Sequence, residues 1–386
     1  MHRRTAVFLA ILAISLGFGT LAATVQDYRL QDFECLRGAA LLVRDGRDPY
    51  DQGTWATATG LPAADAASPR RTSCLGSRFA YPLWTAVLLL PFAFIPYPAT
   101  AALWLALNIG AALSGALLAL RAVDGGWRRA PLALALVVSS QPLVLTIQSG
   151  QIDGIETGLI GLAAWALARR RDRTAGLSLA LALLKPQLLA ATAPLLALRA
   201  PALRRPRPLG AFALGALALL LLSLVVRSSW LAPWLAETTG PRLGIAPLLP
   251  TIWGLAADLT GSAAWGLAPA TLLVLLVVGL GRRLGTAEGL ALATALSVAL
   301  TPHAWSYDHL VLAPAWVMLV GRAAGGRLLQ TQLVVVGLAS VMPWALYALA
   351  LSRGTETLGA LVPIATTVAL AVLARPVAQA PHEAGR

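Results

Sequence analysis

Charged residues are scarce in this sequence, at 12% of its 386 residues, whereas a soluble domain carries about 25%. Hydrophobic residues make up 58%, and long apolar stretches recur from residue 5 to residue 374. They leave no room for a soluble domain of useful size. Because a spanning helix needs about 20 apolar residues, the composition predicts an all-α, polytopic membrane protein with about 10–12 transmembrane helices.

Lysine is almost absent, since Lys185 is the single lysine among 30 basic residues. The formal net charge is +13, which in a soluble protein would suggest nucleic-acid binding. The arginines instead occupy short turns between apolar stretches, without the basic face and interleaved aromatic residues of a nucleic-acid-binding domain. They indicate cytoplasmic loops by the positive-inside rule. They form four clusters: Arg121, Arg128 and Arg129; Arg169, Arg170, Arg171 and Arg173; Arg204, Arg205 and Arg207; and Arg282 and Arg283.

The stretch 5–24 follows a basic N-terminus and resembles a signal peptide, but the rest of the chain is apolar too, so we interpret it as a retained first helix. The charge distribution then places both termini in the cytoplasm and the acidic loop 25–80 outside. We treat 1–386 as one membrane domain, with an external loop and juxtamembrane helices at 25–97 and the remaining transmembrane helices at 98–374. The ten helices predicted from apolar length are 5–24, 98–121, 131–147, 154–169, 209–227, 263–281, 287–301, 310–321, 328–351 and 358–374, with external loops at 148–153, 228–262, 302–309 and 352–357.

Two further apolar segments are not expected to cross the membrane fully. Only one crossing fits between the external loop and the first cytoplasmic arginine cluster, and helix 98–121 supplies it. Tyr81–Tyr97, interrupted by prolines, should therefore lie at the outer interface or dip into the membrane. Segment 174–199 has arginine clusters at both ends, so it must leave and return. We expect two half-spans with a break at Lys185-Pro186, where proline interrupts a helix.

The polar loop after the first helix contains the first candidate site residues. Asp32 is expected at the outer membrane surface, where a carboxylate can act as a general base toward a hydroxyl group; helix capping is the alternative. Glu34 is a second candidate for the same role, and Tyr50 lies in a segment that reads first as a turn. Cys35 and Cys74 share this loop, and the sequence is equally compatible with a disulfide and with two free thiols.

Two short polar clusters follow in the apolar part of the chain. Gln151 and Asp153 lie in a glycine-containing turn between two helices, and Gln151 offers donor and acceptor groups to a hydroxyl-rich ligand; an ordinary connecting turn is the alternative. Lys185, with Gln187 beside it, is an ionisable residue inside an apolar segment and therefore a functional hypothesis. A lysine suits a phosphate group as a point charge. The alternative is a snorkelling or salt-bridged structural lysine.

The last cluster, Thr301–His309, contains two of the four histidines. Its aromatic side chains, Trp305 and Tyr307, suit flat sugar rings, while His303, Asp308 and His309 suit phosphate or hydroxyl groups. An aromatic belt with helix caps is an equal alternative. Asp308 is also an alternative to Asp32 as the base. The two histidines with Asp308 do not have a diagnostic metal-binding spacing, and the sequence shows neither a glycine-rich phosphate loop nor an Asp-x-Asp motif.

These clusters, in this order, resemble the bacterial polyprenol-phosphate-dependent glycosyltransferases of family 87, membrane enzymes of the GT-C fold. The resemblance spans residues 1 to about 320. The matching residues are Asp32-Phe33 followed by Gly46-x-Asp48-Pro49-Tyr50; Tyr81-Pro82 with Pro91 and Leu103-Trp104; Ser149-Gly150-Gln151; Ala175-Gly176 leading to Lys185-Pro186-Gln187; and Thr301-Pro302-His303 with Tyr307-Asp308.

The resemblance implies transfer of a mannose- or arabinose-like sugar from a polyprenyl-phosphate donor to a glycolipid or glycan acceptor, with inversion, on the outer face of a bacterial cytoplasmic membrane. Asp32 would be the base, and Lys185 with His303 and His309 would bind the donor phosphate. The substrates would contact Glu34, Tyr50, Gln151, Asp153, Gln187, Trp305, Tyr307 and Asp308. The partners would be the donor, the acceptor and membrane lipid, with no nucleic acid, no cofactor and no metal.

Two other classes of protein fit the same hydropathy. A transporter or flippase of a lipid-linked saccharide would need polar residues that reach both membrane faces. Here they gather almost entirely on the predicted outer side, which favours an enzyme. A non-catalytic membrane subunit of a cell-envelope assembly would not depend on Lys185.

Overall fold

The structure is a computed structural model that describes residues 30–51, 54–55, 79–194, 206–239, 246–281, 284–323 and 328–373. Every regular element in these ranges is helical, which confirms the predicted all-α fold. The predicted first helix 5–24 and most of the external loop, with Cys74, lie outside the described residues.

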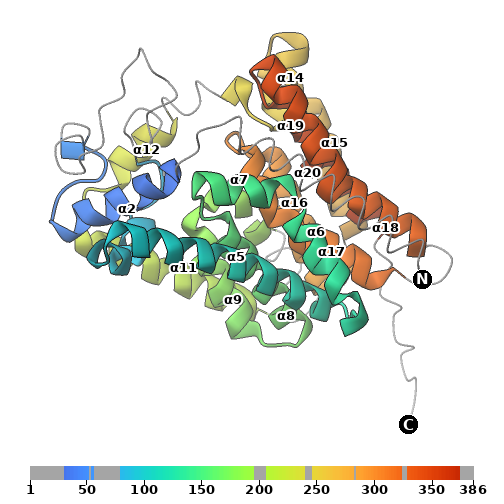
Figure 1. Ribbon diagram of the computed structural model, residues 1–386, viewed down its shortest axis with the longest axis horizontal. Coiled ribbons are helices and arrows are strands. Elements are labelled where there is room, and N and C mark those ends of the chain that lie inside the picture. The colour runs from blue at the N-terminus through green and yellow to red at the C-terminus, as the bar shows by residue number, and fades with distance from the viewer. Residues whose placement is uncertain are drawn as a thin grey trace.

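Most of the described helices follow one another with short connections (Figure 1), whereas residues 45–82, many of them outside the described ranges, separate α2 from α4. The α-helices are α2 (Gln31–Arg44), α4 (Leu83–Leu88), α5 (Tyr97–Ala122), α6 (Ala130–Val138), α7 (Gln141–Ser149), α8 (Asp153–Ala168), α9 (Asp172–Leu181), α11 (Arg207–Val226), α12 (Leu231–Thr239), α14 (Ile252–Thr260), α15 (Leu267–Gly281), α16 (Thr286–Leu300), α17 (Ala313–Arg322), α18 (Leu328–Val336), α19 (Met342–Arg353) and α20 (Leu361–Leu373). The 3-10 helices are η1 (Leu90–Phe94), η2 (Trp127–Arg129), η3 (Ala182–Leu184), η4 (Pro186–Leu189), η5 (Ala246–Leu248), η6 (Ala263–Gly266), η7 (Ser306–Leu312) and η10 (Thr357–Ala360), and η9 (Gly337–Val341) is a wider π-helix.

Three described helices are long and apolar enough to cross a bilayer: Tyr97–Ala122, Arg207–Val226 and the run Leu328–Arg353 that joins α18, η9 and α19. A fourth span is possible if α6 and α7 count as one. Shorter apolar helices occupy Ala263–Gly279, Thr286–Leu300 and Thr357–Leu373. Together with the composition, these helices make the protein an integral membrane protein.

The predicted single helix 131–147 is wrong, because the chain bends there by 55° between α6 and α7. Ser139 and Ser140 separate the two helices, and Pro142 opens the second. Backbone groups freed inside a membrane need partners within the protein. The indole of Trp344 donates to the carbonyl of Ser139 at 3.0 Å, and the hydroxyls of Ser139 and Ser340 lie 2.8 Å apart.

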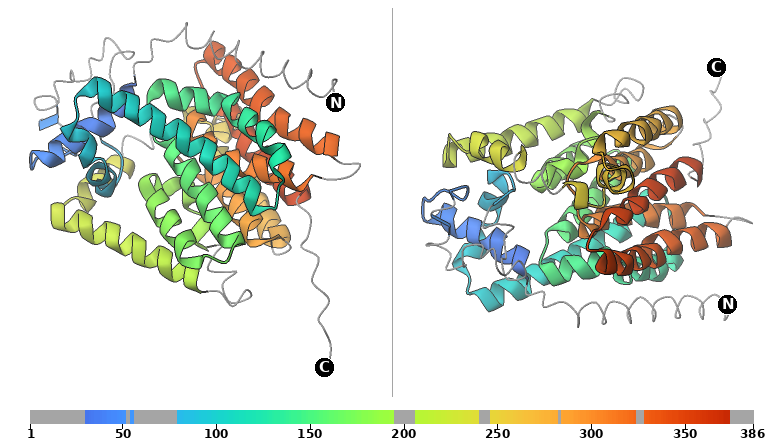
Figure 2. Two further views of the ribbon diagram at one scale, coloured as in Figure 1. Left: turned by 60° about the horizontal axis from the view of Figure 1, so that its bottom comes forward. Right: turned by 90° about the horizontal axis from the view of Figure 1, so that it is seen from above.

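The segment 228–262, predicted as an external loop, contains two short helices, α12 and α14. Each has nine residues, too few to cross a bilayer, so a search for spans of membrane length overlooks them. In α12 the ring of Trp234 packs against Trp230 and Trp84. Figures 1 and 2 place α12 and α2 at the same end of the molecule, with α18 and α19 at the opposite end.

Segment 81–97 forms α4 and η1, neither of which is long enough to cross a bilayer. Two arginines of α2 hold this segment. Arg37 donates to the carbonyls of Phe92 and Ile95 at 3.3 and 3.0 Å, and Arg44 donates to that of Ala93 at 2.8 Å. Side chains of α2, α4, η1 and the start of α5 form a hydrophobic core of their own, separate from the main core around α5, α8, α16 and α17.

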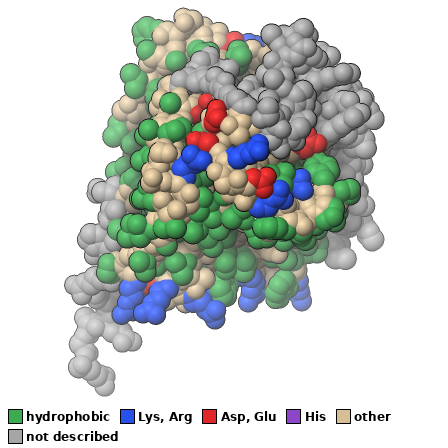
Figure 3. Space-filling model, turned by 90° about the vertical axis from the view of Figure 1, so that its left-hand side faces the viewer, with side chains coloured by type: hydrophobic (Ala, Val, Ile, Leu, Met, Phe, Trp, Pro, Cys, Tyr) green, Lys and Arg blue, Asp and Glu red, His purple; other side chains and the backbone are tan. Residues whose placement is uncertain are grey.

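The outer surface is banded. Figure 3 shows a row of basic side chains along one edge of the molecule, a band of hydrophobic side chains above it, and mixed acidic and basic side chains beyond the band. The arginines at the start of α9 and of α11 are exposed. Helix α11 is almost entirely exposed, although its sequence is strongly apolar. A helix with such a surface is stable facing lipid rather than water.

Helices α5 and α8 pack closely through glycines. A Cβ atom added to Gly115 would lie 2.5 Å from the carbonyl oxygen of Thr157 and 2.8 Å from the Cα atom of Gly158. Small residues let membrane helices approach in this way and gain van der Waals contact. The contact fixes the N-terminal end of α8, where the site described below begins.

This contact gives a matched pair of substitutions within one helix. We expect Gly115→Ala to lower the thermal unfolding midpoint in detergent, because overpacking costs about 1–3 kcal/mol. Gly110→Ala is the control, since a Cβ atom there meets nothing within 4 Å. It should leave the midpoint unchanged or raise it, because alanine favours helix by about 0.8–1 kcal/mol over glycine. Equal midpoints for the two variants would contradict the close α5–α8 contact.

Candidate active site

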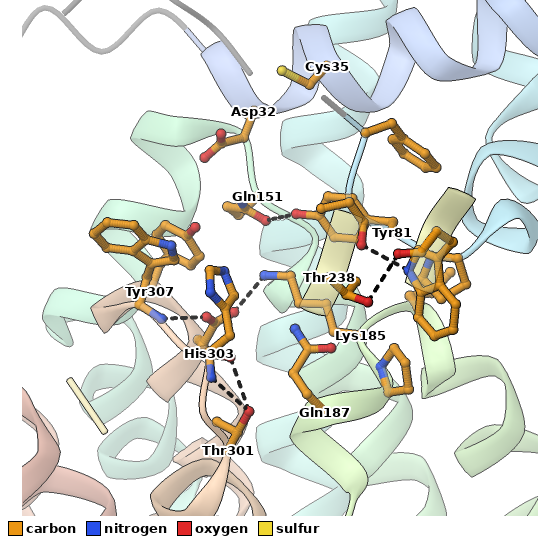
Figure 4. A pocket seen from close by; sticks show the side chains of 18 of the residues that line it. Asp32, Cys35, Tyr81, Gln151, Lys185, Gln187, Thr238, Thr301, His303 and Tyr307 are labelled. Atoms are coloured by element: carbon orange, nitrogen blue, oxygen red, sulfur yellow. Dashed lines mark hydrogen bonds and ion pairs between the residues drawn. The ribbon is translucent and has the colours of Figure 1, made fainter. Parts of the chain in front are cut away.

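A cavity of about 330 Å³ lies beside the hydrophobic core formed by α2, α4 and η1, and residues from six separate parts of the chain line it. Figure 4 shows Asp32 entering from α2 on one side and Lys185 from the opposite side. The sequence-predicted residues that line it are Asp32, Gln151, Lys185, Gln187, His303, Trp305, Tyr307 and Asp308. The structure thus brings together residues from all four polar clusters that the sequence analysis singled out as candidate sites.

Four predicted site residues do not line this cavity. Glu34 accepts a hydrogen bond from the Tyr97 hydroxyl at 3.1 Å, and Tyr50 donates to the backbone of the lining residue Tyr81. Asp153 lies behind Lys185. His309 lines a separate small void with Gln141, Ser306 and Glu356. The structure therefore does not support direct substrate contact by Glu34, Tyr50 and Asp153, or phosphate contact by His309.

Lys185 stands at the break between η3 and η4, where its own backbone leaves the helical conformation. Its ammonium lies 2.9 Å from both carboxylate oxygens of Asp153 and 2.6 Å from Oδ1 of Asp308. All three side chains are buried. The sequence showed each of these residues, but it gave no sign that they meet.

Side chains of α4 satisfy the carbonyls that this break leaves without helical partners. The indole of Trp84 donates to the carbonyl of Leu183 at 2.8 Å, and the hydroxyl of Thr85 donates to that of Leu184 at 3.3 Å. A helix break at membrane depth requires such partners. The juxtamembrane helix thereby supports the backbone on either side of the lysine.

Asp308 is held from both sides. Its Oδ1 accepts from Lys185, and its Oδ2 accepts from the backbone N–H of Trp305 at 2.6 Å, which caps the first turn of η7. The ammonium of Lys185 also lies 4.9 Å from the centroid of the Tyr307 ring, within the range of a cation–π interaction. The side chains of Trp305 and Tyr307 stack with centroids 6.5 Å apart and form one wall of the cavity.

Asp32 is positioned through its neighbour Phe33. The Phe33 ring stacks on Trp104 with centroids 4.9 Å apart, and the Trp104 indole donates to the carbonyl of Gly150 at 2.8 Å. Gly150 has a φ of 75° and ends α7, and a Cβ atom there would lie 2.7 Å from that of Phe33. Glycine is required by both the left-handed conformation and the close approach. Three of the sequence motifs therefore form one packed unit behind Asp32.

A chain of hydrogen bonds joins two other motifs. The hydroxyl of Tyr50 donates to the carbonyl of Tyr81 at 2.7 Å, and the hydroxyl of Tyr81 donates to Oε1 of Gln151 at 2.9 Å. Burial, together with the carboxylates of Asp32, Asp153 and Asp308, raises the pKa of Tyr81 and outweighs the opposite effect of Lys185. The phenol therefore stays protonated and fixes the amide of Gln151, whose Nε2 remains a donor.

The sequence interpretation did not name the lining residues Phe79, Trp234 and Thr238, and it placed Tyr81 and Thr301 in motifs without assigning them a role. Trp234 and Thr238 come from α12, which the sequence left as a loop. Their spacing of four residues puts them on one helix face, so a recognised helix would have revealed the pair. The Trp234 indole donates to the carbonyl of Ala80 at 3.1 Å and ties α12 to the cavity wall.

Among the described residues, no group of three or more histidine, cysteine, aspartate or glutamate side chains is arranged to hold a metal ion. The carboxylates of Asp153 and Asp308 converge on the ammonium of Lys185. Cys35 lines the cavity and is disulfide-bonded, and Cys74, with which the sequence left a disulfide open, is outside the described part of the chain.

Comparison with known proteins identifies the family. The model of glycosyltransferase family 87 matches residues 79–320, more than half of the chain. The chain belongs to glycosyltransferase family 87. No curated protein and no solved structure matches it. The region matched to family 87 includes Gln151, Lys185 and Asp308, so most of the cavity lies within it. The protein is a membrane glycosyltransferase.

Proposed function

We propose that this family 87 protein transfers a mannose- or arabinose-like sugar from a polyprenyl-phosphate donor to a glycolipid or glycan acceptor on the outer face of the membrane. The observation that carries the proposal is the common cavity of Asp32 and Lys185 (Figure 4). A carboxylate and an ammonium that face the same space suit a reaction that removes a proton from one substrate and leaves negative charge on the other.

In the proposed reaction, Asp32 takes the proton of the acceptor hydroxyl. The hydroxyl oxygen forms a bond to the anomeric carbon, and the bond from that carbon to the phosphate oxygen breaks. The electron pair leaves with the phosphate, so the product polyprenyl phosphate gains one negative charge. A single displacement of this kind inverts the anomeric carbon and needs one base.

The positive charge of Lys185 stabilises the phosphate as charge accumulates on it. His303 and Trp305 stand on the same side of the cavity. The Trp305 indole nitrogen is buried and has no hydrogen-bond partner among the described residues. The stacked rings of Trp305 and Tyr307 and the amide of Gln151 suit a sugar.

The membrane orientation is proposed from charge. The exposed arginines at the start of α9 and of α11 belong to the edge expected in the cytoplasm, and the cavity is lined by the connections predicted outside, including Gln151 and the residues from Thr301 to Asp308. A lipid-linked donor in the outer leaflet would then reach the cavity from the membrane. A flippase would need polar groups continuing to the other face, whereas the polar lining belongs to one end of the helices.

A transfer assay tests this function. The purified protein, reconstituted in vesicles, should transfer sugar from a short-chain polyprenyl phosphoryl-mannose or phosphoryl-arabinose to a glycolipid acceptor and release polyprenyl phosphate. The product should have the opposite anomeric configuration to the donor. A nucleotide sugar serves as the control donor. Transfer from the nucleotide sugar alone, or retention of configuration, would contradict the proposal.

A further inference from the structure

The ammonium of Lys185 has no N–H group to spare. A lysine ammonium carries three N–H donors and no acceptor, and three carboxylate oxygens lie within 2.9 Å of it, two from Asp153 and one from Asp308. The side chain is 3% exposed. A phosphate that binds Lys185 directly must therefore take the place of one of these oxygens.

Acidic groups outnumber the single ammonium around Lys185. Three buried carboxyl groups, Asp153, Glu156 and Asp308, surround one ammonium. Neither carboxyl oxygen of Glu156 has a hydrogen-bond partner among the described residues, so this group is held neutral, because an isolated buried carboxylate is too costly. Asp153 and Asp308 with Lys185 then carry a net charge of about −1 when both are ionised.

Asp308 is the carboxylate that a phosphate can displace from the ammonium of Lys185. It lines the cavity, whereas Asp153 does not. Its Oδ2 keeps the N–H of Trp305 when Oδ1 is released. Asp153, in contrast, directs both of its oxygens at Lys185 and would keep the ammonium in place. Figure 4 shows the side chain of Lys185 directed toward the segment that contains His303 and Tyr307.

We propose that the donor phosphate displaces Asp308 from Lys185, and that the Asp153–Asp308 pair takes up one proton from solvent as the donor binds. This inference rests on the proposed role of Lys185 in binding the donor. A phosphodiester adds one negative charge to a buried site whose acidic groups already match or exceed the charge of its one ammonium. One proton restores the original net charge, and the protonated carboxyl can donate a hydrogen bond to the phosphate.

Other titratable groups face the pair from every neighbouring element. From α8 comes Glu156, which is already neutral, and from the segment before α4 and from η7 come the phenols of Tyr81 and Tyr307, which are protonated. His309 lies in the separate void, and Asp32 and His303 line the cavity itself. The remaining charged neighbours are Lys185 and Glu356. Of these, Asp32, His303 and Glu356 can compete for the proton, and the variants below separate the two that line the cavity from the pair.

Calorimetric titration in two buffers of different ionisation enthalpy counts the protons. The probe is a short-chain polyprenyl phosphoryl-mannose, whose phosphodiester has no proton to gain near neutral pH. The wild-type protein should take up about one proton for each donor bound, and its affinity should then rise by about tenfold for each unit of falling pH in the range where the pair is ionised. Binding without proton uptake would overturn the inference and leave the proposed donor intact, whereas failure to bind the probe would overturn both.

Variants locate the proton. Asp308→Asn leaves Asp153 and Lys185 as a balanced pair, so the phosphate should then bind without uptake. His303→Gln and Asp32→Asn should keep an uptake of about one proton, and loss of uptake in either would overturn the assignment to the pair. If Asp308→Asn does not fold, Asp153→Asn serves in its place, because it too leaves one carboxylate with one ammonium and should abolish uptake.

Discussion

Replacing Asp32 by asparagine is expected to slow sugar transfer by about 10²–10⁴-fold, the usual contribution of a general base. The amide keeps the size of the side chain but cannot take the proton of the acceptor hydroxyl. Because the change affects the chemical step, the loss should appear in kcat. The measurement is transfer from a polyprenyl-phosphate sugar in reconstituted vesicles, with the thermal unfolding midpoint as a check on folding.

Glu34→Gln is the matched control, since Glu34 lies on the same helix two residues further along. Its carboxylate accepts from Tyr97 and does not line the cavity, so transfer should stay within a few-fold of wild type. Full activity in Asp32→Asn would reject Asp32 as the base. Asp308, the alternative, has both carboxylate oxygens engaged by Lys185 and by the backbone of Trp305, which leaves it less free to accept a substrate proton.

The second large effect is expected from Lys185→Met. Methionine approximates the length of the aliphatic chain but removes the ammonium, so the buried carboxylates of Asp153 and Asp308 lose their counter-charge. Removing one partner of a buried ion pair costs about 3–5 kcal/mol. We expect a lower thermal unfolding midpoint in detergent, together with loss of both donor binding and transfer.

A compensating variant separates the two effects. Lys185→Met combined with Asp153→Asn and Asp308→Asn removes the unpaired charges, so it should recover much of the stability, because a buried ion pair can be replaced by neutral groups at little cost. Donor binding should remain absent in the combined variant. If the combined variant binds donor and transfers sugar at the wild-type rate, Lys185 has a structural role alone, as the sequence also allowed.

The sequence was sufficient to predict the helical membrane fold and most of the parts of the chain that form the cavity, but not α12. Apolar length and arginine clusters carry that information, because both reflect the membrane itself. It also singled out Lys185, since an ionisable residue inside an apolar segment is costly unless it has partners. It could not identify those partners, because Asp153 and Asp308 come from other helices and meet the lysine only after these have packed.

Side-chain direction was the other gap. Asp308 and His309 are adjacent in sequence, but on a tight helix such as η7 consecutive side chains point about 120° apart. One therefore reaches Lys185, and the other lines a separate void. Asp153 and Gln151 likewise diverge at the start of α8, where the chain passes from a turn into a helix. Candidates that are neighbours in sequence are thus divided: Gln151 and Asp308 line the cavity, whereas Asp153 and His309 lie behind its wall.

The bonds from Trp84 and Thr85 to the carbonyls before Lys185 attach the backbone next to the ammonium to α4 as well as to the helix that leads to it. Helix α4 is tied through η1 and the arginines of α2 to the segment that precedes α5. Through α4 and η1, Lys185 is therefore also attached to the side of the protein where the cavity lies. A thinner or thicker bilayer would alter the tilt of long helices such as α5 and α11. The separation between Asp32 and the ammonium of Lys185 would instead follow the position of α4 and η1.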